Sequence, residues 1–304
     1  MSHETTPHEH SFLYQPCIDS EKIGLQRRKQ LNIPDETALE IALETWESIQ
    51  TGFYLSSTTE QRVDWQSAVE AARLNKISIA PDAPLPERPT RRFEQTLVQI
   101  ANESSLMAAH RLYKQGQKPL VLSFADGEEP GGYFLEFRGS QEQALCRSSA
   151  LYVTLKGDDM YEAHRNRSLP DATDWAIYSP DVPVFRDDKG KKLEEPYPVT
   201  FISCVAPYVP SVGQPESGNL LEQRIHRILD IAHAYGHTAL VLGAWGCGNF
   251  ENDVYRTAVD FRMALEGPYS LCFEEVIFAI VDWTPARNIL GPFRKVFSLG
   301  KPHS

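Results

Sequence analysis

The spacing between short apolar, β-rich stretches is the feature that most constrains this chain. Segments with helical periodicity separate these stretches, which fall at residues 119–124, 199–205, 238–242 and 276–281. Strands joined by helical connections of about a dozen residues or more are typical of βαβ units, whose strands run parallel and are covered on both faces. The pattern therefore predicts an α/β fold with a largely parallel sheet, and helices over 219–235 and 252–266.

The chain divides into three regions. Residues 1–30 are polar and predict a mobile tail. Residues 31–90 predict a helical N-terminal extension, with helices starting at Asp35 and over 59–74, and then a connection, IAPDAPLPERP, whose proline density no helix tolerates. Residues 91–298 hold the alternating strands and helices, with further helices predicted over 93–115 and 140–152, and no internal repeat is visible.

Charge and cysteine usage limit the partners of this chain. Its 30 Lys and Arg against 41 Asp and Glu give a net charge of −11, which argues against direct binding of DNA or RNA. No apolar run approaches the roughly 18 residues of a membrane span, and the first residues lack a secretory signal. Five scattered cysteines without a CxxC pair suit a reducing compartment. We therefore expect an intracellular protein, cytoplasmic or nuclear, that acts as a monomer away from membranes.

Two glycine-containing loops follow predicted strands and are the candidate sites of chemistry. The first, SFADGEEPGGYFLEFRGSQEQALC, contains Gly131 and Gly132; the second, GAWGCGNFEND, contains three glycines. Ligands of open α/β sheets bind at the carboxyl ends of strands, where backbone N–H groups and a helix N-terminus attract anions. Neither loop has the spacing of a P-loop or of a dinucleotide fingerprint. The pair predicts phosphate or nucleotide binding, with simple strand-to-helix packing as the alternative.

The motifs, taken in order, resemble a known family. They are PGG, eight residues, then QE; a helix with Arg147-Ser148-Ser149 and Leu151-Tyr152; GAWGCGxFxND; and FAIxD near the C-terminus. This series resembles the microbial-type poly(ADP-ribose) glycohydrolases over about residues 38–295. The resemblance implies a macrodomain-like three-layer α/β/α sandwich with a mixed, largely parallel sheet and a helical N-terminal extension. It also implies ADP-ribose, or an ADP-ribosylated protein, as the partner.

The resemblance implies roles for individual residues. Gly131 and Gly132 match the first two positions of a triple-glycine loop that lines the diphosphate and distal ribose, and Glu142 matches a glutamate that contacts that ribose. Residues 243–249 match the diphosphate loop, and Phe250 the aromatic residue that orients the distal ribose. Asp282 ends the last strand, where either adenine contact or a strand-end turn is expected. The residues expected to bind the ligand are Asp126, Gly131, Gly132, Tyr133, Gln141, Glu142, Gly243, Ala244, Trp245, Gly246, Cys247, Gly248, Asn249, Phe250 and Asp282.

The chain departs from the family pattern at three places. Tyr133 replaces the third glycine, and Phe137-Arg138 replace a Gly-Ala pair. Gln143 replaces the glutamate that the family uses as general acid/base, so the expected signature Gln-Glu-Glu reads Gln-Glu-Gln. An amide neither gives nor takes the proton, and general acid–base catalysis contributes about 10²–10⁴-fold. Strongly reduced glycohydrolysis is therefore predicted.

Other groups offer alternatives to the missing glutamate. Glu142 is the nearest carboxylate, and Asp126, Glu128 and Glu142 together offer oxygen ligands for a divalent metal near the diphosphate. A solvated acidic loop is the simpler interpretation, and no other cofactor is expected. Three functions stay open: an ADP-ribose-binding protein with lost or strongly reduced hydrolysis; an active glycohydrolase that uses Glu142 or a metal on terminal or mono-ADP-ribose; and a scaffold that binds no ligand.

Overall fold

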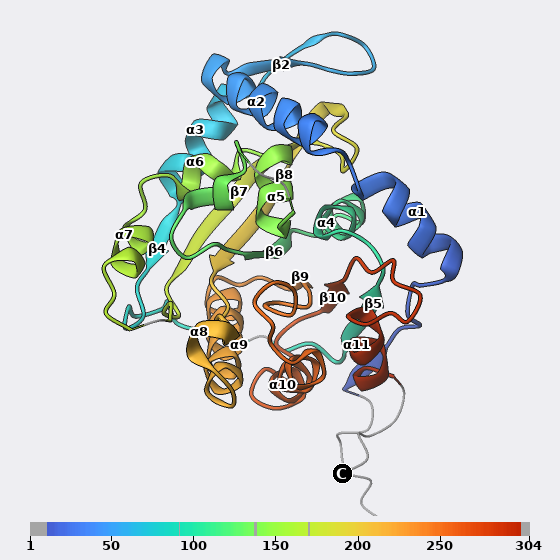
Figure 1. Ribbon diagram of the computed structural model, residues 1–304, viewed down its shortest axis with the longest axis vertical. Coiled ribbons are helices and arrows are strands. Elements are labelled where there is room, and N and C mark those ends of the chain that lie inside the picture. The colour runs from blue at the N-terminus through green and yellow to red at the C-terminus, as the bar shows by residue number, and fades with distance from the viewer. Residues whose placement is uncertain (1–10, 91, 137–138, 170, 299–304) are drawn as a thin grey trace, which may run out of the picture.

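The main sheet is mixed and largely parallel. The computed structural model describes residues 11–90, 92–136, 139–169 and 171–298, and within them eight strands form this sheet. In spatial order the strands are β1 (Phe12–Tyr14), β5 (Thr96–Ala101), β10 (Glu275–Ala279), β9 (Ala239–Leu242), β6 (Pro119–Phe124), β8 (Lys192–Cys204), β7 (Ala176–Arg186) and β4 (Ile77–Ile79). Neighbours from β1 to β8 pair in parallel, and β7 and β4 add an antiparallel edge (Figure 1). The predicted α/β fold is confirmed.

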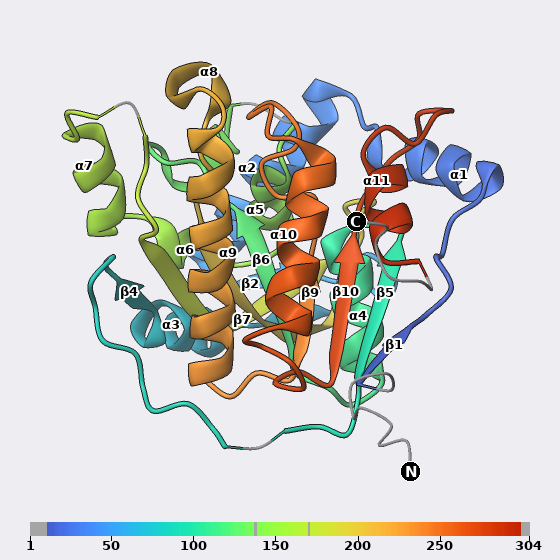
Figure 2. The same cartoon turned by 90° about the horizontal axis from the view of Figure 1, so that it is seen from below.

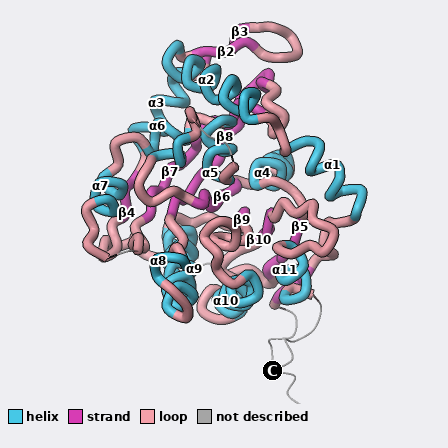
Figure 3. The backbone as a smooth tube through the Cα atoms, in the orientation of Figure 1, coloured by secondary structure: helices cyan, strands magenta, loops and turns pink. Residues whose placement is uncertain are grey.

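Helices cover both faces of this sheet (Figures 2 and 3). One face carries α2 (Asp35–Thr51), α3 (Gln66–Asn75), α4 (Ser105–Lys114), α5 (Gln141–Ser148), α6 (Leu151–Leu155) and α7 (Asp159–Arg165). The other carries α9 (Glu216–Ala234), α10 (Val254–Glu266) and α11 (Leu290–Val296). Smaller elements are α1 (Glu21–Leu31), the β2–β3 hairpin (Phe53–Leu55 and Arg62–Asp64), the 3₁₀ turn η1 (Pro130–Tyr133) and α8 (Val209–Val212).

Strand β6 shows why this sequence forms a three-layer sandwich. Val121 packs into the core beneath α4 and α5, whereas Leu120 and Leu122 pack into the core beneath α9 and α10. Successive side chains of a strand point to opposite faces, so a strand covered on both sides must be apolar throughout. The continuous apolar run of β6 is this pattern, and it places the loop after β6 at the edge where the site lies.

The predicted mobile tail is wrong for most of residues 11–30. Residues 1–10 lie outside the described residues, but β1 pairs with β5 in the main sheet. Helix α1 follows, and the Ser20 hydroxyl caps it by accepting a hydrogen bond of 3.1 Å from the Ile23 N–H. A serine followed by an acidic residue is a helix-start signal, which the polar composition of this region concealed.

Two predicted helices are also corrected. Residues 93–115 form strand β5 and then α4, because β5 is held between β1 and β10 and Ser104 caps a new helix, its hydroxyl accepting a hydrogen bond from the Met107 N–H. Residues 59–74 begin as a hairpin strand, and helix α3 starts only at Gln66. Long-range strand pairing decided both cases, and local periodicity does not report it.

Most of the remaining predicted elements agree with the structure within a few residues, but the strand predicted over 199–205 is only the second half of β8, which begins at Lys192. Helices predicted over 219–235 and 252–266 are α9 and α10, and the segment over 140–152 divides into α5 and α6. All five cysteines are free thiols. Within the described ranges, the helices are all too short or too polar to pass through a membrane.

Candidate functional site

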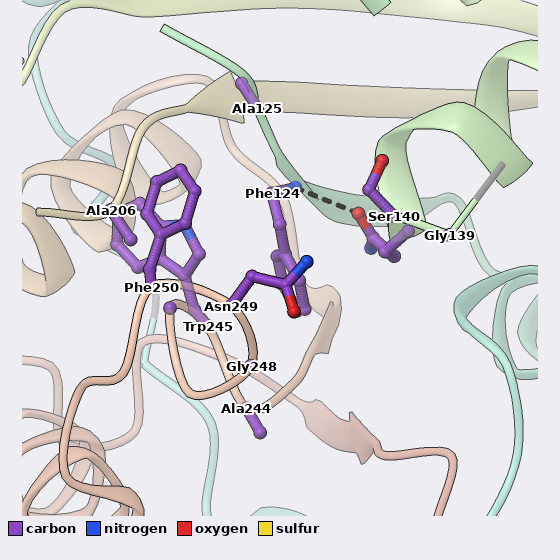
Figure 4. A pocket seen from close by; sticks show the side chains of 12 residues that line it. Phe124, Ala125, Gly139, Ser140, Ala206, Ala244, Trp245, Gly248, Asn249 and Phe250 are labelled. Atoms are coloured by element: carbon purple, nitrogen blue, oxygen red, sulfur yellow. Dashed lines mark hydrogen bonds between the residues drawn. The ribbon is translucent and has the colours of Figure 1, made fainter. Parts of the chain in front are cut away.

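The two glycine loops meet at the carboxyl edge of the sheet, as predicted. Strands β6 and β9 are parallel neighbours, so the loops that follow them face each other across a cavity of 210 Å³. Figure 4 shows Ser140 on one side of this cavity and Trp245 and Phe250 on the other. The lining residues are Phe124, Ala125, Gly139, Ser140, Gln141, Ala206, Ala244, Trp245, Gly246, Gly248, Asn249 and Phe250.

The loop after β9 is held in place from behind. Gly246 has a φ of +74°, and a Cβ there would lie 2.7 Å from Ala206 Cβ, so this position requires glycine. The Asn252 amide group donates hydrogen bonds to the carbonyls of Pro207 (2.8 Å) and Gly246 (3.1 Å), and its oxygen accepts one from the Ser217 hydroxyl (2.7 Å). The sequence therefore fixes the shape of the loop independently of any ligand.

This loop offers unused hydrogen-bond donors to the cavity. Across the described residues, the backbone N–H groups of Gly246, Gly248, Asn249 and Phe250 donate to no protein acceptor, although all four residues line the cavity. A Cβ added to Gly248 would meet open space. A row of free N–H groups between a strand and a helix is the arrangement that binds phosphate groups.

Aromatic side chains form one wall of the cavity. Trp245 is fully buried, and Phe250 packs edge-on against Tyr208 with ring centroids 5.3 Å apart. Among the described residues, no acceptor is bonded to the Trp245 indole N–H. Cys247 is buried away from this cavity, and burial raises its pKa to about 12, so its thiol is not a nucleophile here.

The two glycines of the loop after β6, which the resemblance places at the ligand, do not line the 210 Å³ cavity. Gly131 and Gly132 have φ values of +72° and +57°, and their backbone packs against side chains of α5. A Cβ on Gly131 would be 3.2 Å from Cys146 Sγ, and one on Gly132 would be 3.2 Å from Glu142 Oε2. Tyr133 also has a positive φ, of +61°, and its side chain is about half exposed. Residues 137–138, the second departure from the family, lie outside the described residues.

Glu142 is enclosed by this turn. Its side chain has no exposed surface; Oε2 accepts a hydrogen bond of 2.8 Å from the Asp126 N–H, and Oε1 has no hydrogen-bond partner in the described chain. Desolvation by burial raises the pKa of Glu142 well above its usual value, and the Asp126 carboxylate raises it further. Glu142 therefore does not line the cavity, and in this arrangement it is not placed to act as the replacement acid or base.

Gln141 and Gln143 anchor the N-terminus of α5, the helix that carries Glu142. The Gln141 carbonyl oxygen accepts a hydrogen bond of 2.9 Å from the Phe124 N–H, and its amide group donates to the Leu122 carbonyl and the Ser105 hydroxyl. Gln143 forms a capping box with Ser140, in which each side chain accepts a hydrogen bond from the other residue's N–H. Gln141 lines the cavity, whereas Gln143 does not.

The predicted metal ligands are not gathered into a metal cage. Asp126 Oδ1 accepts hydrogen bonds of 2.8 Å from the N–H groups of both Glu128 and Glu129, so it closes its own turn. Glu128 is exposed, whereas Glu142 is enclosed beneath the glycines. In the part of the chain that the structure describes, no three His, Cys, Asp or Glu side chains are grouped to hold a metal ion.

The Asp282 carboxylate closes a turn after the last strand of the sheet. Its carboxylate accepts hydrogen bonds from the N–H and hydroxyl of Thr284 and from the N–H groups of Ile289 and Leu290 (2.6–3.1 Å). Burial acts to raise its pKa, but these hydrogen bonds outweigh it and lower the pKa overall. Of the two outcomes expected here, the strand-end turn is the one observed, and the neighbouring Trp283 lines a second cavity.

A second cavity, of 530 Å³, extends the first one along the sheet edge. The two share Phe124, Gly139, Ser140, Gln141, Ala244 and Gly248. The second continues past the ends of β5 and β10 to the corner between α1 and α2, where Asn32 and Ile33 line it. Together the cavities form one cleft across four neighbouring strands.

Sequence reasoning missed most residues of the larger cavity, and Glu103 and Ser104 show why. They lie at the carboxyl end of β5 and line the larger cavity, and Glu103 pairs with Arg111 at 2.6 Å. The signal was present as the polar run NESS after an apolar stretch. Because residues 93–115 read as one helix, no strand end was expected there.

Comparisons with known proteins agree with this geometry. The model of the catalytic domain of microbial-type PARG matches residues 42–187. A poly(ADP-ribose) glycohydrolase from Thermomonospora curvata is 35% identical over 86% of this chain and 99% of its own, with a TM-score of 0.80. The enzyme from Deinococcus radiodurans, solved in complex with ADP-ribose, is 36% identical over 76% of this chain and 97% of its own, with a TM-score of 0.71. Among curated proteins, none matches this sequence.

The fold and cleft define an α/β protein with a glycine loop beside a cleft at the edge of a mixed sheet. With the family match and these structural relatives, the chain belongs to the microbial-type poly(ADP-ribose) glycohydrolase family. The resemblance noted from the sequence motifs is thereby confirmed, and with it the α/β fold.

Proposed function

We propose that this protein binds ADP-ribose, free or attached to protein, in the cleft formed by the two cavities. The observation that carries the proposal is the row of free backbone N–H groups at Gly246, Gly248, Asn249 and Phe250. A diphosphate at this loop places one ribose in the smaller cavity, beside Phe250, and the adenosine in the larger one. The larger cavity, of 530 Å³, lies within the range of about 300–1,000 Å³ that binding pockets span, and the smaller one of 210 Å³ extends it.

We further propose that glycohydrolysis is lost or strongly reduced. Gln143 carries an amide where the family resemblance implies the acid/base glutamate, and an amide does not exchange a proton with a leaving oxygen or with water. Glu142, the nearest carboxylate, is enclosed and has a raised pKa. Both observations favour a binding protein over the alternative of an active enzyme that uses Glu142.

Calorimetric titration with ADP-ribose tests the binding. Gly248→Glu directs a charged side chain into the open space of the cavity without a backbone clash, so we expect a loss of affinity of at least about 100-fold. Gln223→Glu adds the same charge on the exposed side of α9 and serves as the control. Equal affinities for Gly248→Glu and the control would contradict the assigned cleft. Adding EDTA tests the metal predicted from sequence, and we expect unchanged affinity.

Release of ADP-ribose from poly- and mono-ADP-ribosylated substrates tests the second part. We expect turnover by the wild type to be about 100-fold or more below that of the Gln143→Glu variant, the scale of general acid–base catalysis. Wild-type turnover equal to that of the variant would instead establish an active glycohydrolase that does not need a carboxylate at this position.

A further inference from the structure

The Gln143 side chain joins the glycine turn η1 to the start of α5, where Ser140 and Gln141 line the cleft. Its carbonyl oxygen accepts a hydrogen bond of 3.0 Å from the Ser140 N–H, and its Nε2 donates to the Gly132 carbonyl. The residue is only 7% exposed, so water competes little for these bonds. One amide therefore ties the glycine turn η1 to the N-terminus of α5.

The tied turn is the cover of Glu142. A Cβ on Gly132 would be 3.2 Å from Glu142 Oε2 and 3.7 Å from Asp126 Cβ, so the backbone of the turn lies directly on the carboxylate. Glu142 has no exposed surface beneath it. If the turn lifted, this carboxylate would become accessible at the edge of the cleft.

The bond to Gly132 requires a donor at residue 143. A carbonyl oxygen only accepts, and of the two polar atoms of the Gln143 side chain only Nε2 carries hydrogens. An ionised carboxylate of the same shape keeps the bond from Ser140 but sets a charged oxygen against the Gly132 carbonyl. The closed turn is thus compatible with an amide, or with a protonated acid, and incompatible with a carboxylate.

We propose that Gln143 is a positioning residue that latches the turn η1 over Glu142 and so fixes the end of the cleft. With the turn closed, the smaller cavity ends at Ser140 and Gln141, and a bound ribose meets aromatic and backbone groups but no acidic side chain. This consequence for the ligand rests on the proposed function. The latch itself rests only on contacts within the chain.

Hydrogen–deuterium exchange of the full chain without ligand tests the latch. The readout is the peptide spanning 126–136, which includes the Phe134 N–H bonded to the Gly131 carbonyl. At pD 8 we expect Gln143→Glu and the neutral Gln143→Met to exchange at least about tenfold faster than the wild type there, with β9 and β10 unchanged. Gln223→Glu, on the exposed side of α9, adds a charge elsewhere and should match the wild type.

Lowering the pD separates a latch from a general loss of packing. Protonation returns a donor to the Gln143→Glu variant, so its protection should recover toward the wild type, whereas Gln143→Met should not recover. Asp126 and Glu142 face the same turn but are present in both variants, so the difference between the variants reports residue 143 alone.

Wild-type exchange rates in both variants at pD 8 would overturn the proposal, as would a Gln143→Glu variant that shows no recovery at low pD. If Gln143→Glu also lost protection in β9, Gln143→Met would decide the result at pD 8. The exchange experiment contains no ligand. A failed titration with ADP-ribose would therefore overturn the proposed function without contradicting the latch.

Discussion

Two buried carboxylates in this protein have opposite energetics. Asp282 accepts four hydrogen bonds, whereas Glu142 has one oxygen without a partner among the described residues. Hydrogen bonding holds the pKa of Asp282 below its usual value, and burial holds that of Glu142 above it. Glu142 therefore costs folding free energy whenever it is ionised, and Asp282 contributes it.

Glu142→Gln should stabilise the fold at neutral pH. A folded-state pKa above the unfolded one means that stability is greatest below the unfolded pKa of about 4.5 and falls as the pH rises from there. The neutral amide lacks this loss, so we expect it to raise the free energy of unfolding by about 1 kcal/mol or more at pH 7.5, and by less near pH 4. Urea unfolding at both pH values measures this, with the exposed Glu128→Gln as control. Equal stability at pH 7.5 would contradict the enclosed carboxylate.

At the scale of the element, Asn252 decides the shape of the loop after β9. It connects the loop to the segment after β8 and to the start of α9 through three hydrogen bonds. These bonds order the loop before any ligand binds, so ligand binding does not lose free energy by ordering it.

Asn252→Ala should weaken both folding and binding. It leaves the Pro207 carbonyl and the Ser217 hydroxyl without these partners, while the Gly246 carbonyl keeps only the bond from the backbone N–H of residue 252. We expect the loss to cost about 1–3 kcal/mol of unfolding free energy. A mobile loop should also lower the affinity for ADP-ribose about tenfold. Thermal unfolding and calorimetry measure the two effects. The exposed Asn75→Ala at the end of α3 is the control, and an unchanged affinity would show that the loop keeps its shape without Asn252.

Elements that are marked by local sequence signals, such as a glycine after an apolar run, could be predicted from the sequence. Elements that depend on pairing with segments distant in the sequence could not. Glycines after apolar runs located both loops, and the apolar run of β6 identified its strand. Strand β5 reads as helix because its neighbours β1 and β10 are distant in sequence, and this error concealed Glu103 and Ser104. The enclosure of Glu142 depends on a turn closed by Gln143, an interaction that no local pattern reports.

At the scale of the whole molecule, the first and last elements hold each other. Arg287, before α11, pairs with Asp19, before α1, at 2.9 Å, and donates to the Ser20 carbonyl. Both charged side chains are nearly buried. The contact fixes the start of α1, and the other end of this helix leads to the corner that forms the far wall of the larger cavity.

Arg287→Ala should therefore act at both ends of the chain. It leaves the Asp19 carboxylate buried with only Asn102 and the more distant Arg294 as partners, at a cost of about 3 kcal/mol. Chemical unfolding measures this cost, and the half-exposed Arg294→Ala, with its longer contact of 3.4 Å, should cost under about 1 kcal/mol. If the two variants were equally stable, the Arg287 pair would not be what holds the termini.

Strand β10 lies between β5 and β9, although it is the last strand of the chain to be made. During synthesis, β5 is made before β10, its inner neighbour in the sheet. Translation of the residues between the two strands takes roughly 10 s or more at about 5–20 residues per second. During that time β5 presents an unpaired edge to the cell, which is a liability for aggregation and a target for chaperones. A nascent chain that lacks β10 also lacks the wall of the larger cavity that Ala279 and the residues after it form.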